Sequence, residues 1–168
     1  MQKFRFLIIL GFLMFTQACG IYSFTGTNLD ERVKTIQVDY FPNNAVLVEP
    51  SLSNTFTDSF RDLFLQQTNL GLVNSGGDLI FEGEITGYKI NPMTATAEQT
   101  AAQNRLTITV NIRFYNKFVP EDDFEKTFSH YYDYDGSQQL VGGILDDAFN
   151  QIIERITQDI FNASVAKW

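Results

Sequence analysis

The sequence is short of cysteine and histidine, with one of each among 168 residues. A single cysteine, Cys19, excludes an intramolecular disulfide. A single histidine, His130, excludes metal sites built on two or more imidazoles and leaves only one candidate base for a Ser-His-acid triad. His130 lies in the aromatic stretch 128–132, where a histidine is more often packed or solvated than catalytic. These shortages argue against the common catalytic schemes.

Basic residues are also few, since 12 Lys and Arg stand against 20 Asp and Glu, for a net charge of −8. An acidic chain lacks the basic face that binds nucleic acid. It also lacks the positive charge that attracts proteins to anionic lipid. The apolar run at 6–15 has only about half of the roughly 20 residues that a membrane span needs.

The start of the chain has the layout of a secretory signal. Lys3 and Arg5 precede the apolar run, and Ala18 and Cys19 follow it. A small residue directly before a cysteine resembles the bacterial lipobox, in which the cysteine is acylated and becomes the first residue of the mature protein. We expect a lipoprotein signal peptide at 1–18 and a lipid on Cys19. The alternative is a plain signal peptide with an incidental cysteine.

The mature chain then has the size of one domain. Its 150 residues carry 10 basic and 20 acidic side chains, a net charge of −10. A chain of this length can bury about 68–70% of its unfolded surface and fold without disulfides. We expect a lipid-anchored extended linker at 19–32 and a single domain at 33–168.

Hydrophobic periodicity predicts four strands and two helices. Apolar residues alternate at 33–41, 78–91 and 105–116, as they do in half-buried strands, and the aromatic-rich segment 124–135 is predicted to be the fourth strand. A helix is predicted to begin at Pro50 and a second one after Gly142-Gly143, each with one apolar stripe. The segment 69–77 is predicted to be the stop between the first helix and the second strand.

These patterns predict an α+β fold of two layers, in which both helices pack on one face of a four-stranded, mostly antiparallel sheet in the order β-α-β-β-β-α. The second to fourth strands should form an antiparallel meander. In the first strand, Tyr40 should share a face with Ile36 and Val38. In the second, Tyr88 should continue the polar face. The predicted core contains Phe56, Phe60, Leu63, Ile108, Val110, Ile112, Ile152 and Ile156.

No segment carries a specific catalytic or metal-binding pattern. Glu82 and Glu84 should point to one face, an arrangement that glycosidase carboxylates use, but a solvated strand face explains them better. The acidic turn at 120–123 lacks the alternation and glycine of a calcium loop. The glycine pairs at 76–77 and 142–143 do not make a phosphate-binding motif. We expect no cofactor apart from the covalent lipid.

Two motifs nevertheless resemble a known family. The chain reads Cys-Gly-Ile-Tyr-Ser-Phe at 19–24 and Glu-Gly-Glu-Ile-Thr-Gly-Tyr at 82–88, and it closes in Ala-Lys-Trp at 166–168. These segments are similar to those of the LptE family, the outer-membrane lipoproteins of lipopolysaccharide assembly. The order of predicted elements is also the one that this family has.

The resemblance implies a binding function without catalysis. LptE-family proteins are anchored at the periplasmic face of the outer membrane, where they partner and plug an LptD-type β-barrel, assist its assembly and bind lipopolysaccharide. On this basis Ile21, Tyr22 and Phe24 are candidate barrel contacts, unless they pack on the domain's own sheet. Lipopolysaccharide phosphates should pair with Lys89, Arg105 or Arg113. The alternative function is that of a generic exported envelope lipoprotein that binds a soluble ligand.

Overall fold

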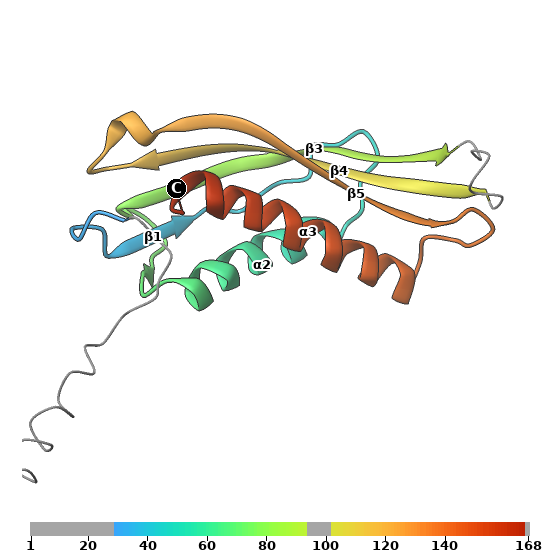
Figure 1. Ribbon diagram of the computed structural model, residues 1–168, viewed down its shortest axis with the longest axis horizontal. Coiled ribbons are helices and arrows are strands. Elements are labelled where there is room, and N and C mark those ends of the chain that lie inside the picture. The colour runs from blue at the N-terminus through green and yellow to red at the C-terminus, as the bar shows by residue number, and fades with distance from the viewer. Residues whose placement is uncertain (1–28, 94–101, 167–168) are drawn as a thin grey trace, which may run out of the picture.

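The computed structural model describes residues 29–93 and 102–166, which form one sheet and one layer of helices. The elements are β1 Thr35–Val38, α2 Leu52–Gln67, β2 Gly71–Leu72, β3 Leu79–Met93, β4 Gln103–Asn116, η2 Pro120–Asp122, β5 Phe124–Asp135 and α3 Gly143–Ser164. Figure 1 shows α2 and α3 on one face of the sheet, with the long strands β3, β4 and β5 running along the molecule. The predicted two-layer α+β fold is confirmed.

The sheet has five strands in the order β2-β1-β3-β4-β5. The antiparallel meander of β3, β4 and β5 is confirmed, and β1 joins it parallel to β3. The fifth strand, β2, pairs parallel with β1. It lies within segment 69–77, which was predicted to separate the first helix from the next strand without a strand of its own. Two residues are too short to produce an alternating pattern, so periodicity did not reveal this strand.

The core lies between the sheet and the two helices. Seven of the eight predicted core residues are buried, and Leu63 is partly buried against them. Phenylalanine rings pack against one another in this core. The centre of the Phe60 ring lies 5.2 Å from the centres of the Phe64 and Phe81 rings and 5.9 Å from that of Phe41. Edge-to-face pairs of this kind add to the stabilisation from burial. Among the described residues, no helix is long and apolar enough to span a membrane.

Gly83 is required because the Phe41 ring and the β4 backbone lie directly against it. A Cβ atom at this position would lie 2.1 Å from the main-chain oxygen of Asn111 and 2.6 Å from the Phe41 ring. The backbone of β3 can therefore approach both groups only because Gly83 has no side chain. This glycine belongs to the 82–88 motif, which thus has a structural basis.

Two tyrosines do not lie where the alternation placed them. β1 ends at Val38, so Tyr40 is 54% exposed and Phe41 turns into the core instead. In β3 the register shifts between Ile85 and Gly87, which is a β-bulge. The extra residue reverses the alternation, and Tyr88 becomes buried on the helix side. Burial raises the pKa of Tyr88 to about 12.

Candidate functional site

One face of the sheet is left uncovered by the helices. Strand pairing assigns to it every second residue of β3, β4 and β5, with the parity changing at the bulge. We call this surface the open face. It consists of Ile80, Glu82, Glu84, Gly87, Lys89, Asn91 and Met93 on β3, Gln103, Arg105, Thr107, Thr109, Asn111, Arg113 and Tyr115 on β4, and Glu125, Thr127, Ser129, Tyr131, Asp133 and Asp135 on β5.

The middle of the open face is small and hydroxylated, whereas charges gather toward its ends. One central row reads Gly87, Thr109 and Ser129, and the two hydroxyl oxygens are 3.0 Å apart. Toward the two ends, Arg113 and Arg105 each lie on β4 and pair with a carboxylate on a neighbouring strand. Most of the open face is therefore polar, with the apolar side chains of Ile80 and Met93 near its two ends.

The three predicted lipopolysaccharide contacts all lie on the open face, but they do not form one cluster. Arg105 pairs across the sheet with Asn91, two residues along β3 from Lys89, so Lys89 and Arg105 are neighbours. Arg113 is eight residues away on β4, a distance of about 27 Å along a strand. The other predicted site residues, Cys19, Ile21, Tyr22 and Phe24, lie outside the described residues.

Arg105 is held in place by two groups on β5. Its Nε and Nη2 donate to the Oδ1 and Oδ2 of Asp133 at 2.6 and 2.7 Å, which is a bidentate pair. Its guanidinium carbon lies 3.6 Å from the centre of the Tyr131 ring. The hydrogen bonds with Asp133 raise the pKa of Arg105. Sequence analysis missed both partners, because pairing between strands cannot be read from one strand's alternation.

Glu82 and Glu84 of the 82–88 motif each contact another side chain of the protein. Glu82 Oε2 lies 3.6 Å from Nε of Arg113, and Glu84 accepts a hydrogen bond from the Nδ2 of Asn44 at 2.7 Å. Each carboxylate thus has its own partner, and the two do not converge on a common point. This agrees with the interpretation of a solvated strand face.

His130 lies on the opposite, helix-facing side of β5. Its Nε2 is 2.7 Å from Oδ2 of Asp159 on α3, so the pair links the edge strand to the helix. Among the described residues no group of three or more His, Cys, Asp or Glu side chains is arranged to hold a metal ion. His130 therefore contributes to packing between layers.

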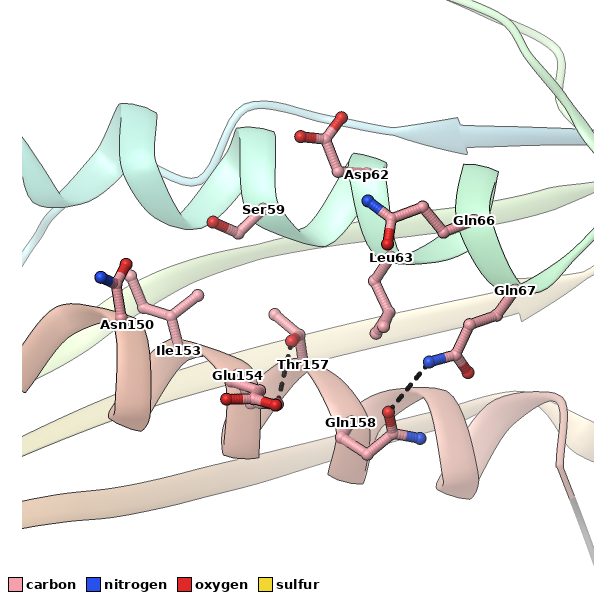
Figure 2. A pocket seen from close by; sticks show the side chains of 10 residues that line it. All are labelled: Ser59, Asp62, Leu63, Gln66, Gln67, Asn150, Ile153, Glu154, Thr157 and Gln158. Carbon is pink, nitrogen blue, oxygen red and sulfur yellow. Dashed lines mark hydrogen bonds between the residues drawn. The ribbon is translucent and has the colours of Figure 1, made fainter. Parts of the chain in front are cut away.

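A groove runs between α2 and α3 on the outer surface of the helix layer (Figure 2). It encloses about 460 Å³, and its walls carry mostly amide, hydroxyl and carboxylate groups. Gln67 donates to Gln158 across it at 3.1 Å. Asp62 and Glu154 are its only charged lining residues, so the groove is electrostatically unfavourable for phosphate.

Comparisons with known proteins agree with this architecture. Residues 33–164 match the profile of a family described as LptE: Lipopolysaccharide-assembly. A search of curated protein sequences found no match. The hypothetical protein CT253 from Chlamydia trachomatis superposes with a TM-score of 0.55 at 7% identity, over 80% of this chain and 99% of that chain.

A second solved structure, PelC from the Paraburkholderia phytofirmans dodecamer, superposes with a TM-score of 0.50 at 5% identity, over 83% of this chain and 95% of that chain. At such low identities the two solved structures show a shared fold alone. The family profile says more, because it covers all the described strands and helices. On that match, this chain belongs to the LptE family of lipopolysaccharide-assembly proteins.

Proposed function

We propose that this protein is the lipid-anchored partner of a lipopolysaccharide-translocating, LptD-type β-barrel at the periplasmic face of the outer membrane. Family membership supports a function in lipopolysaccharide assembly. The signal sequence that ends at Cys19 supports a lipid anchor. The protein acts by binding and positioning its partners rather than by catalysis.

The open face is the observation that carries the barrel partnership. A barrel lumen is polar, so a plug must present polar surface to it. Here the uncovered side of three long strands is mostly polar, and its arginines already have carboxylate partners within the protein. At these two arginines, covering the open face does not leave an unpaired charge buried, which is the costly outcome. The open face is therefore suited to a lumen wall.

Lys89 is the foremost candidate for a lipopolysaccharide phosphate. Its side chain is exposed, and the described residues place no carboxylate within 4 Å of its ammonium group. Arg105, by contrast, is oriented by Asp133 and adds a second, fixed cation beside it. A phosphate that reaches both would gain charge-assisted hydrogen bonds from a mobile and a fixed donor.

Purification from outer membranes tests the partnership. We expect tagged full-length protein in mild detergent to retain a large β-barrel in a 1:1 ratio, identified by mass spectrometry. Depleting the protein should lower surface lipopolysaccharide and leave the barrel misassembled. Cys19→Ala should remove the protein from the membrane fraction. If no barrel is retained and depletion changes neither property, the generic envelope lipoprotein is the better description.

A further inference from the structure

The loop between β1 and α2 presents three consecutive aliphatic side chains to solvent. Val46, Leu47 and Val48 have relative exposures of 107%, 53% and 59%. Single exposed apolar residues are normal on protein surfaces, whereas a contiguous apolar patch marks an interaction site more often. We call this segment the Val46–Val48 loop.

Hydrogen bonds hold both ends of the Val46–Val48 loop in place. The Asn43 side chain accepts a hydrogen bond from the Ala45 N–H at 3.1 Å and donates one to the Glu49 carbonyl at 3.4 Å, so it joins the two stems. The Asn44 N–H donates to the Ile85 carbonyl at 2.9 Å, and Ala45 is buried. The apolar tip is thus held out by an ordered base, which lowers the entropy lost on binding.

The loop stands beside the open face. The Nδ2 of Asn44 donates to Oε2 of Glu84 at 2.7 Å, and Glu84 is an open-face residue. Glu49 lies at the other stem. The apolar tip is therefore flanked by two carboxylates, in a chain whose net charge is −8.

We infer that the Val46–Val48 loop inserts into an apolar pocket with a basic rim on the barrel partner, and this inference rests on the proposed function. An aliphatic anchor buried in a pocket is a common centre of binding energy. The flanking carboxylates complement a basic rim. They oppose the alternative occupant, an anionic lipid surface, because like charges repel.

Two measurements on full-length, tagged protein in outer membranes test this inference. In the first, a photoreactive benzophenone amino acid replaces Leu47 or, as a control, Leu65, which lies on α2 and is 47% exposed. We expect a covalent adduct with the barrel from position 47 and none from position 65. In the second, Leu47→Asp should reduce the barrel recovered by about tenfold or more, whereas Leu65→Asp should leave it unchanged.

A charge variant tests the rim. Glu84→Gln keeps an oxygen that can accept from Asn44 but removes the negative charge. We expect the barrel recovered with this variant to fall less steeply with added salt than that recovered with the wild type. An unchanged salt dependence would contradict the basic rim.

The outcomes separate the inference from the proposed function. If the wild type retains the barrel but Leu47→Asp and Leu65→Asp behave alike, the loop is not the anchor and the partnership stands. An adduct at position 47 that contains lipid and no barrel also overturns the inference. If the wild type retains no barrel, the proposed function fails first. The crosslinking result remains decisive even if Leu47→Asp were to fold poorly.

Discussion

Asp78 connects the start of β3 to the start of β1, and its replacement should destabilise the domain in a pH-dependent way. Its Oδ2 accepts three hydrogen bonds, from the Lys34 N–H at 3.0 Å, the Thr35 N–H at 3.1 Å and the Thr35 hydroxyl at 2.9 Å. The side chain is only 13% exposed. One carboxylate thus satisfies three donors at the parallel junction of the sheet.

The magnitude follows from those donors. Hydrogen bonds to a charged group contribute about 1.5–3 kcal/mol each, but three bonds to one oxygen are not additive, and the exposed Lys34 N–H can bond to water. We therefore expect Asp78→Ala to lower the free energy of unfolding by about 2–3 kcal/mol. Asp78→Asn retains an acceptor oxygen and should lower it by about 1 kcal/mol.

The pH dependence has a definite sign. The hydrogen bond from the Lys34 amide, followed by those from Thr35, holds the pKa of Asp78 below its ordinary value. A lowered pKa in the folded state means that the stabilisation is complete above the unfolded pKa of about 3.9 and is lost as the pH falls through the folded pKa. The wild type should therefore exceed Asp78→Asn in stability at pH 7, and the gap should narrow below about pH 4.

Urea unfolding of the wild type, Asp78→Asn and Asp62→Asn from pH 7 to pH 3 measures this gap. Asp62 is an exposed carboxylate on α2 that accepts no hydrogen bond from the described residues, so it serves as the matched control. Its variant should follow the wild type at every pH. A gap between the wild type and Asp78→Asn that stays constant from pH 7 to pH 3 would refute the reasoning, because the carboxylate would then have the same pKa in both states.

Three further predictions concern the core, the motif and the open face. Phe60→Ala should lower the free energy of unfolding by about 3–5 kcal/mol, whereas Leu65→Ala on the exposed side of α2 should change it by less than about 0.5 kcal/mol; urea unfolding compares them. Gly83→Ala should destabilise by about 1–3 kcal/mol or more, since its Cβ would overlap a main-chain oxygen 2.1 Å away; wild-type stability would show that β3 can move aside. Lys89→Ala and Arg105→Ala should each reduce the lipopolysaccharide that co-purifies, with the double variant retaining least; an unchanged amount would place the contact elsewhere.

Periodicity predicted those parts of the fold in which one side chain in two, or one stripe of a helix, is buried. β5 has the predicted bounds, and the aromatic residues Phe124, Phe128 and Tyr134 lie on its helix-facing side, although Lys126 on the same side is exposed. The helix α3 was predicted because its buried stripe runs without a gap from Ala148 to Phe161. When one face of an element is buried along its whole length, apolar residues recur in the sequence with the period of that element.

Periodicity predicted only part of the candidate site. The alternation placed Lys89, Arg105 and Arg113 in strands, but it gives no register between strands, so the pairing of Arg105 with Asp133 could not be foreseen. The exposure of Val46, Leu47 and Val48 could not be predicted from the sequence for another reason. Consecutive apolar residues usually indicate burial, yet here the chain holds them out on a clasp formed by Asn43. If the loop binds the partner as we infer, its burial depends on a second molecule, which the pattern of one chain does not show.

The bulge in β3 connects the failed prediction for Tyr88 to the proposed function. Without the extra residue, the alternation would place Lys89 on the helix side and Tyr88 on the open face. With it, Tyr88 packs 6.5 Å from the ring of Phe149 on α3, and Lys89 joins Arg105 on the uncovered side. One inserted residue therefore both adds Tyr88 to the core under this half of the sheet and brings Lys89 to the open face. Bulges are retained where they re-aim side chains, and here the re-aimed side chain is the one that we expect to meet phosphate.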